Sequence, residues 1–254
     1  MPTFRTVFVT GASSGIGAAC ARAFAAAGAR LLLAARRGER LEALAAELRE
    51  AHRTETHLLE LDVRDDGVVV RSLAGLPADW GEIDVLVNNA GLSRGLDPVQ
   101  QGDPRDWDEM LDTNVKGLLY VTRAVLPGMI ARGRGHVINL GSVAGHEVYR
   151  GGAVYCASKH AVDAITRALR LDVLGTGVRV STVDPGLVET EFSLVRFRGD
   201  AERAGSVYQG LTPLTPADVA DAVLWCATRP PHVNVSELLL LPTDQASATA
   251  VHRR

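Results

Sequence analysis

The sequence predicts an α/β fold, a single-domain Rossmann-type doubly wound parallel sheet of about seven strands with helices on both faces. Short apolar runs alternate with longer helical patterns from one end of the 254-residue chain to the other. The apolar runs lack the strict alternation of half-exposed strands, as expected when helices cover both faces of a sheet. The first run also leads straight into a glycine-rich turn and a helix.

The expected elements follow in regular order. The strand at 6–9 precedes an alanine-rich helix that ends at Gly28, and the strand at 31–35 precedes the amphipathic helix ERLEALAAELREA. Further buried strands are expected at 57–63, 83–88, 136–140, 178–183 and 238–241. Strand, helix and strand in series imply right-handed crossovers, and hence a parallel sheet.

Residues 1–254 are expected to form one domain. The chain has no internal repeat and no long Pro/Gly linker, and its 46% hydrophobic content is enough for a large core. The least regular stretch is 187–214, where charges are mixed and periodicity is weak. We expect a loop with a short helix there, which in such a fold is a natural substrate lid.

Composition excludes several classes of protein. The net charge of −3 arises from interspersed acids and bases, without the basic face that nucleic-acid binding needs. No apolar run has the length of a membrane span or a signal peptide. Three cysteines and seven histidines without metal-ligand spacing predict reduced thiols and no metal. We therefore expect a cytoplasmic protein with a small-molecule partner.

The turn TGASSGIG at 10–17 is a candidate phosphate-binding site. Glycines permit a tight turn and close approach to a pyrophosphate, and the N–H groups at the helix start stabilise its charge. The spacing G-x-x-x-G-x-G differs from the general G-x-G-x-x-G pattern, and a plain strand-to-helix connector remains an alternative. The cofactor contacts expected here are Gly11, Ser13, Ser14, Gly15, Ile16 and Gly17.

The end of the second strand indicates which dinucleotide binds. NAD-binding proteins place an acid about 20 residues after the glycines to bind the ribose 2′-hydroxyl. Here Ala35 occupies that place, and Arg36 and Arg37 follow it. A guanidinium binds a 2′-phosphate through charge-assisted hydrogen bonds, so NADP is favoured, with Arg36 the stronger candidate. Two solvated arginines at a helix start are the alternative.

The glycine spacing resembles the cofactor motif of the short-chain dehydrogenase/reductase superfamily, and further motifs of that family follow in order. They are Asp62-Val63, the NNAG run that ends in Asn89, Ala90 and Gly91, TNVKG with Asn114, Ser142 after a strand, the YxxxK pair Tyr155 and Lys159, and the turn Pro185-Gly186. The resemblance implies that these residues, together with Val188 and Thr190, surround the cofactor and the reacting carbon.

The run YCASK places a phenol and an ammonium group on one face of a helix. A tyrosine of pKa near 10 is a poor base, and lowering the value by about three units requires roughly 4 kcal/mol. A cation about 4 Å away at an effective dielectric near 20 supplies that interaction. The resemblance implies that Tyr155 is the acid/base and that Lys159 also holds the nicotinamide ribose. It also implies that Ser142 binds the substrate oxygen and Asn114 a relay water.

The last third of the chain has a narrower resemblance. PGLVETEFS, VRFRGD, LTPADVA and PHVNV are similar to the NADP-dependent 3-hydroxy acid dehydrogenases, including serine dehydrogenases and malonic semialdehyde reductases. This implies a serine or short 3-hydroxy acid substrate. Its carboxylate would need a cation, and loop arginines are the candidates, with two aromatic residues as pocket walls. These residues are Arg94, Arg150, Arg196 and Arg198, and Tyr149 and Phe192.

Two other functions remain open. One is an NADPH-dependent carbonyl reductase acting on a secondary-metabolite aldehyde or ketone, since the fold does not determine the substrate. The other is an NADP-sensing module without turnover, which the complete set of catalytic residues disfavours. The family resemblance also implies a homotetramer, or a homodimer, formed through helices expected at 153–174 and 216–228.

Overall fold

The computed structural model describes residues 4–254, which form one seven-stranded sheet in the order β3-β2-β1-β4-β5-β6-β7. All six neighbouring pairs are parallel. The strands are β1 (Thr6–Thr10), β2 (Arg30–Ala35), β3 (Thr56–Glu60), β4 (Val85–Asn88), β5 (Gly135–Leu140), β6 (Val178–Pro185) and β7 (Glu237–Leu240). The predicted doubly wound parallel sheet is confirmed.

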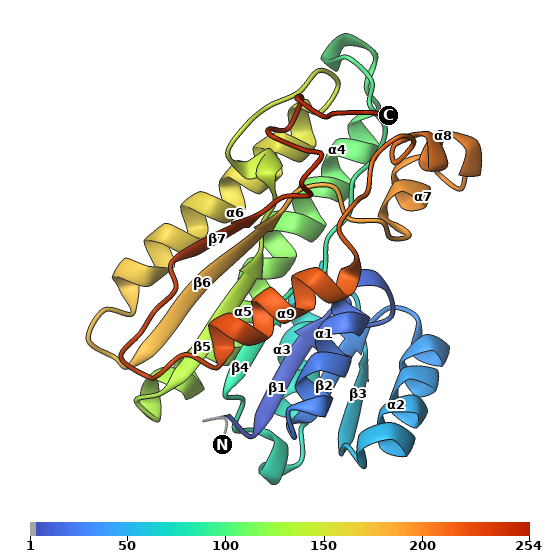
Figure 1. Ribbon diagram of the computed structural model, residues 1–254. Coiled ribbons are helices and arrows are strands. Elements are labelled where there is room, and N and C mark those ends of the chain that lie inside the picture. The colour runs from blue at the N-terminus through green and yellow to red at the C-terminus, as the bar shows by residue number, and fades with distance from the viewer. Residues whose placement is uncertain (1–3) are drawn as a thin grey trace.

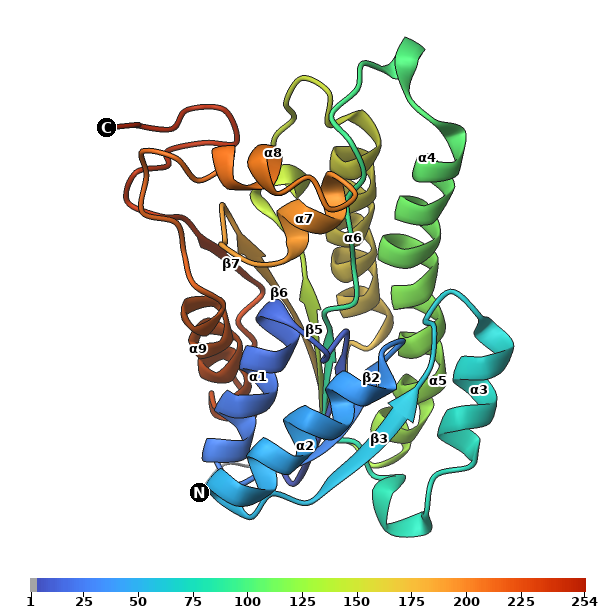
Figure 2. The same ribbon diagram turned by 90° about the vertical axis from the view of Figure 1, so that its right-hand side faces the viewer.

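Helices cover both faces of the sheet (Figure 1). They are α1 (Gly15–Ala26), α2 (Gly38–His52), α3 (Asp66–Ala74), α4 (Pro104–Leu111), α5 (Leu118–Ala131), α6 (Ala153–Asp172), α7 (Phe192–Arg196), α8 (Ala201–Ser206) and α9 (Pro216–Ala227). Figure 2 shows α1, α2 and α9 on one side of the sheet and α3, α5 and α6 on the other. None of the described helices is long and apolar enough to cross a membrane.

The two faces of the sheet have separate hydrophobic clusters. Val7 and Val9 of β1 pack in the cluster with α1 and α9, whereas Phe8 between them packs in the cluster with α5. All three side chains are fully buried. Since successive side chains of a strand point to opposite faces, a strand covered on both sides must be apolar throughout. This explains why the strands appear in the sequence as continuous apolar runs.

The structure corrects two of the expected boundaries. The third strand ends at Glu60 rather than at residue 63, because its pairing ends where Glu60 meets Ala35, the last residue of β2. Residues 61–63 therefore leave the sheet. The stretch 187–214 contains two short helices, α7 and α8, rather than one. The helices expected at 153–174 and 216–228 are confirmed as α6 and α9.

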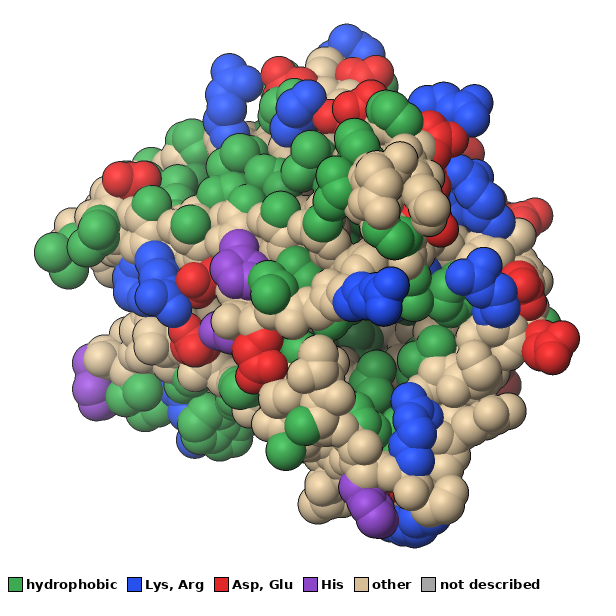
Figure 3. All heavy atoms as spheres, turned by 90° about the horizontal axis from the view of Figure 1, so that it is seen from above, with side chains coloured by type: hydrophobic (Ala, Val, Ile, Leu, Met, Phe, Trp, Pro, Cys, Tyr) green, Lys and Arg blue, Asp and Glu red, His purple; other side chains and the backbone are tan. Residues whose placement is uncertain are grey.

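The topology places a crevice at the carboxyl ends of the strands. The strand order reverses between β1 and β4, and in open α/β sheets ligands bind at such a switch point. The segment 187–214 follows β6 at this end of the sheet, and Figure 2 shows α7 and α8 above the carboxyl ends of the strands. Viewed from above, Lys and Arg side chains border a hollow with hydrophobic side chains at its floor (Figure 3).

Candidate active site

A cavity of about 570 Å³ occupies the crevice. It brings together most of the residues that the sequence predicts for the site. Those that line it are Gly11, Ser13, Ser14, Gly15, Ile16, Arg36, Arg37, Asp62, Val63, Asn89, Ala90, Gly91, Ser142, Tyr149, Arg150, Tyr155, Lys159, Pro185, Gly186, Val188, Thr190, Phe192 and Arg196. Four of the predicted residues lie outside the lining: Gly17, Arg94, Asn114 and Arg198.

The glycine-rich turn between β1 and α1 has the backbone that a pyrophosphate site requires. Gly11 and Gly15 have φ angles of +66° and +52°, which favour glycine. A Cβ on Gly17 would lie 2.4 Å from the Gly11 carbonyl oxygen, so the helix start packs closely on the turn. Asn89 fixes the turn from β4, because its Nδ2 donates to the carbonyl oxygens of Thr10 and Gly11 at 2.9 and 3.2 Å.

The helix start itself is suited to an anion. Ser14 is the N-cap of α1, and its side chain makes no capping hydrogen bond. The first N–H groups of a helix have no intrahelical partner, and the helix dipole favours negative charge beside them. Ser13, Ser14 and Gly15 all line the cavity, so a pyrophosphate fits the residues present at this point.

Arginines occupy the neighbouring end of the cavity, where Ala35 stands in place of an acid. Arg37 donates from Nε and Nη2 to Ser13 Oγ at 3.2 and 3.1 Å, and from Nη2 to Ser14 Oγ at 2.8 Å. Its Nη1 donates to Glu191 Oε2 at 3.2 Å. The structure thus attaches Arg37, rather than the favoured Arg36, to the phosphate-binding turn. Both guanidinium groups fit a 2′-phosphate.

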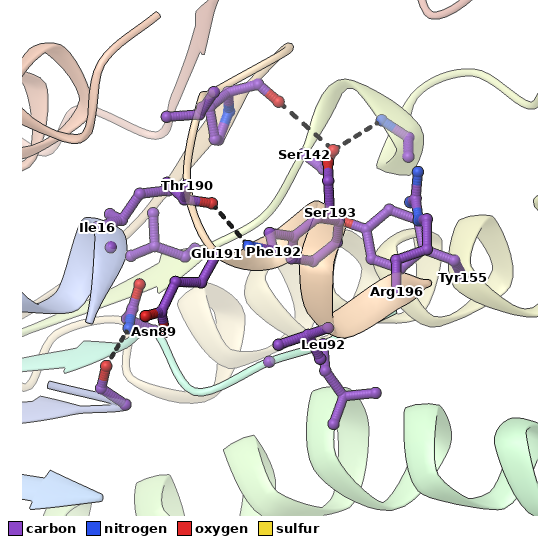
Figure 4. A pocket seen from close by; sticks show the side chains of 18 of the residues that line it. Ile16, Asn89, Leu92, Ser142, Tyr155, Thr190, Glu191, Phe192, Ser193 and Arg196 are labelled. Atoms are coloured by element: carbon purple, nitrogen blue, oxygen red, sulfur yellow. Dashed lines mark hydrogen bonds between the residues drawn. The ribbon is translucent and has the colours of Figure 1, made fainter. Parts of the chain in front are cut away.

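Helix α6 presents Tyr155 and Lys159 on one face toward the cavity, as their spacing predicts. Lys159 Nζ lies 6.0 Å from the centroid of the Tyr155 ring and donates to the Leu140 carbonyl oxygen at 2.8 Å. Ser142 follows β5, and its Oγ accepts from Ala144 N at 3.1 Å. Figure 4 shows Ser142 and Tyr155 facing the same part of the pocket, with Phe192 beside them.

Asn114 lies behind this group in a π-helical turn, Asp112–Gly117, between α4 and α5. Its Oδ1 accepts from Leu92 N at 2.8 Å, and its Nδ2 donates to Leu92 O at 2.8 Å and to Ser158 Oγ at 3.0 Å. Such π turns within helices are frequent at functional sites. Asn114 therefore connects the loop after β4 to α6, and its Oδ1 keeps a second lone pair.

Burial controls the ionisation of the central pair. It raises the pKa of Tyr155 well above its ordinary value, and the nearby Arg196 opposes that shift only in part. Burial lowers the pKa of Lys159 to about 8, with Asp184 opposing. Among the described residues, desolvation outweighs the charges around the phenol and favours its neutral form. The lowered tyrosine pKa that the sequence suggested stays a prediction.

Arg196 lies inside the cavity among aromatic rings. The carbon of its guanidinium is 5.2 Å from the ring centroid of Tyr155 and 5.1 Å from that of Phe192. Its Nε donates to Ser93 Oγ at 3.1 Å and its Nη2 to Tyr149 Oη at 3.0 Å. Among residues 4–254, no carboxylate lies within ion-pair distance of this side chain. Its charge is available to an anion that enters the cavity.

The other predicted arginines separate into two groups. Arg150 lines the cavity. Arg94 instead pairs with Glu109, its Nε 2.7 Å from Oε2, and Arg198 pairs with Asp106. Both acids belong to α4, which draws these two arginines to the outside of the cavity. Arg94 and Arg198 therefore lie outside the lining of the cavity, where the sequence led us to expect them.

Sequence reasoning missed several residues of the site. Glu191 and the C-terminal residues Gln245 and Arg253 also line the cavity. Beneath Lys159 lies buried Asp184, whose Oδ1 accepts from Thr182 Oγ1 at 2.7 Å. Glu191 and Asp184 adjoin predicted site residues in the sequence, and that closeness was the available signal, whereas Gln245 and Arg253 lie far along the chain from every predicted residue.

One group of described residues has the side chains of a metal site: His146, Asp184 and Glu237, whose candidate ligand atoms lie within 4.8 Å of one another. His146 Nε2 is 3.2 Å from Asp184 Oδ2, and His146 Nδ1 is 3.8 Å from Glu237 Oε1. The imidazole thus lies between the two carboxylates, and His146 Nε2 and Asp184 Oδ2 are buried without a hydrogen-bond partner among the described residues. The absence of a metal stays a prediction.

Comparison with known proteins places the chain among well-described relatives. The family model for short chain dehydrogenases matches residues 5–199. An NADP-dependent 3-hydroxy acid dehydrogenase, YdfG, from Salmonella typhi is 50% identical over 249 residues, which cover 97% of this chain and 99% of the relative. Sulfoacetaldehyde reductase 2 from Chromohalobacter salexigens is also 50% identical over 249 residues, covering 97% of this chain and 98% of that protein.

A solved structure supports the same grouping. The closed form of a serine dehydrogenase complexed with NADP+ superposes with a TM-score of 0.91 at 47% sequence identity. The match covers 98% of this chain and 100% of the other.

Proposed function

The chain belongs to the short-chain dehydrogenase family, and we propose that it is an NADP-dependent oxidoreductase interconverting a short 3-hydroxy acid, or serine, and the corresponding semialdehyde. The observation that carries the proposal is the position of Arg196, a cation in the cavity that has no acidic partner among the described residues and lies against the Tyr155 ring. The names of the relatives agree with it.

NADP would lie along the cavity. The glycine turn would bind the pyrophosphate, Arg36 and Arg37 the 2′-phosphate, and Asp62 with Val63 the adenine. The nicotinamide end would border residues from the loop after β4, from α6, and from the end of β6 and the chain that follows it: Asn89, Ala90, Gly91, Tyr155, Lys159, Pro185, Gly186, Val188 and Thr190. When bound, the cofactor supplies or accepts the hydride, and the protein contributes placement and electrostatics.

Side chains of the protein would carry out the proton transfer. In the reduction, the neutral phenol of Tyr155 donates its proton to the carbonyl oxygen, which Ser142 Oγ–H holds by a hydrogen bond. Lys159, whose pKa of about 8 leaves it mainly charged at neutral pH, stabilises the phenolate that remains. Asn114 Oδ1 would hold a water through which a replacement proton reaches the tyrosine. Oxidation runs through the same groups in reverse.

The residues that line the cavity support a substrate with a carboxylate. Ser142 and Tyr155 define where the reacting oxygen binds, and Arg196 is the neighbouring cation, with Arg150 the second candidate. A carboxylate paired with a partly desolvated guanidinium forms strong, directional hydrogen bonds. In a short 3-hydroxy acid, the hydroxyl would bind at Ser142 and Tyr155 and the carboxylate at Arg196. Tyr149 and Phe192 would pack on the carbon chain.

A sulfonated aldehyde is a second candidate, favoured by the 50% identity to a sulfoacetaldehyde reductase. A sulfonate presents an anion to the same arginine. The test is a spectrophotometric assay with NADP+ or NAD+ and L-serine, D-serine, 3-hydroxypropionate, 3-hydroxyisobutyrate, isethionate and a neutral secondary alcohol. Fast turnover of the carboxylates with NADP+ supports the main proposal. Preference for isethionate favours the second candidate, and exclusive use of the neutral alcohol contradicts both.

We also propose that the enzyme is a cytoplasmic homotetramer, or a homodimer, with 187–214 as its lid. Large apolar side chains on the outer faces of the predicted interface helices support the assembly. Leu171 of α6 is 75% exposed and Trp225 of α9 is 46% exposed. Burying such side chains against a partner is favourable. The three cysteines, Cys20, Cys156 and Cys226, are buried free thiols, which suits a reducing compartment.

A further inference from the structure

An acidic residue of the proposed lid reaches across the crevice to two arginines, one just after β2 and one in the first turn of α2. Glu191 Oε2 accepts from Arg37 Nη1 at 3.2 Å, and Glu191 Oε1 accepts from Arg40 Nη1 at 2.8 Å. Glu191 and Arg37 both line the cavity. Arg37 also donates to Ser13 and Ser14, so the carboxylate meets the same guanidinium that faces the phosphate-binding turn.

A carboxylate and a phosphate monoester compete for one guanidinium, because both accept its planar N–H donors through charged oxygens. The two arginines lower the pKa of Glu191, with the hydrogen bond from Arg40 the largest cause, so the residue is anionic at neutral pH. The side chains of Arg37 and Glu191 are each 40% exposed. Ion pairs of this exposure are weak, and a dianionic ligand can displace them.

We propose that Glu191 is a specificity-determining residue that competes with the cofactor 2′-phosphate for Arg37, and so lowers the preference of the enzyme for NADP over NAD. The inference rests on the proposed NADP site. NAD carries a neutral hydroxyl at this position, which neither repels the carboxylate nor needs the guanidinium. Glu191 therefore changes the ratio of the affinities for the two cofactors.

The contact between Glu191 and Arg37 also connects the proposed lid to the start of α2. A change in the affinity for one cofactor could therefore come from altered lid closure alone. A change in lid closure acts on both cofactors, however, and cancels in the ratio of their dissociation constants. Glu191→Gln preserves shape and removes the charge. Glu189→Gln is the matched control, since Glu189 belongs to the same segment, is exposed and does not line the cavity.

The experiment is calorimetric titration of wild type, Glu191→Gln and Glu189→Gln with NADPH and with NADH at low ionic strength. We expect the NADH/NADPH ratio of dissociation constants to rise about threefold in Glu191→Gln and to stay constant in Glu189→Gln. Added salt should reduce the change.

Two other outcomes are distinguishable from each other. If wild type prefers NADPH but the ratio is unchanged or lower in Glu191→Gln, or rises equally in Glu189→Gln, this inference is overturned while the NADP assignment stands. If wild type binds NADH as tightly as NADPH, the NADP assignment and the inference are overturned together.

Discussion

Arg196 and Tyr155 stack in the cavity, with the guanidinium carbon 5.2 Å from the ring centroid. One belongs to α7 and the other to α6, so the segment 187–214 brings a cation to the residue proposed to transfer the proton. In the proposed reaction, the reacting oxygen would bind near Tyr155 and the anionic end of the substrate near Arg196. The contact between the two side chains also couples the position of α7 to that of α6.

Replacing Arg196 should therefore affect acids more than neutral alcohols. For Arg196→Gln we expect kcat/KM for a 3-hydroxy acid to fall about 10- to 100-fold, since a charge-assisted hydrogen bond contributes about 1.5–3 kcal/mol. A neutral alcohol should lose much less. Arg198→Gln is the control, because Arg198 pairs with Asp106 outside the cavity. Equal losses for both substrate types would contradict the role of Arg196.

Tyr155→Phe should separate catalysis from cofactor binding. Removing the phenolic proton donor should lower kcat by about 10²- to 10⁴-fold, the usual contribution of general acid–base catalysis. The ring, which packs at 5.6 Å centroid distance from Phe192, remains, so NADPH should bind within about twofold of wild type. Steady-state kinetics and titration measure the two quantities. Turnover equal to wild type would refute the assigned mechanism.

The pH dependence should follow Lys159. Its pKa of about 8 predicts that kcat/KM for NADPH falls above about pH 8, as the ammonium loses its proton in the free enzyme. Asp184 raises the lysine pKa, so Asp184→Asn should move this fall to lower pH. A pH profile of both proteins at saturating aldehyde is the measurement. An unmoved profile would show that Asp184 does not act on Lys159.

Whereas activity should fall above pH 8, the contribution of Lys159 to the free energy of unfolding should rise. Between about 8 and the ordinary value of 10.5, the unfolded chain binds a proton at Lys159 that the folded chain does not. The contribution of this group to the free energy of unfolding therefore rises with pH across that window. Urea titration of Lys159→Met beside wild type should show a weaker rise for the variant. Deprotonation of Lys159 above pH 8 is therefore expected to lower activity without lowering this group's own contribution to stability.

The proposed role of the glycine-rich turn in binding the pyrophosphate can be tested by measuring NADPH binding alone. Gly17→Ala places a Cβ 2.4 Å from the Gly11 carbonyl oxygen and 2.5 Å from Asn89 Nδ2, so the turn must shift. We expect NADPH affinity to fall at least about tenfold, because the backbone can no longer approach the pyrophosphate. Gly205→Ala meets nothing within 4 Å and should bind as wild type. Calorimetric titration checks both variants.

Assembly is open to a direct measurement. Trp225→Glu puts a charge on the exposed face of α9 and should lower the mass observed by light scattering, because burying an unpaired charge at an interface is costly. Val99→Glu changes a residue of similar exposure outside the proposed helices and should keep the wild-type mass. A wild-type monomer, or equal masses for Trp225→Glu and wild type, would contradict the proposed interface.

Local patterns in the sequence were enough to predict the doubly wound sheet and most of the cavity. Buried strands are apolar on both faces, so Val7, Phe8 and Val9 appear as one run, and the Tyr155 to Lys159 spacing places both side chains on one helix face. The chain after each strand falls at the same edge of a parallel sheet. Motifs that follow strands therefore meet there regardless of their separation in the chain.

Tertiary structure alone decided how the charges pair and how the central tyrosine ionises. The sequence did not distinguish between four arginines as candidates to bind the substrate carboxylate. In the structure, acids on α4 pair with Arg94 and Arg198, while Arg196 lines the cavity. The contact of Glu191 with Arg37 spans distant parts of the chain. The pKa of Tyr155 rises because burial outweighs the effect of the nearby Arg196. These properties depend on distance and desolvation between segments remote in sequence, which no local pattern encodes.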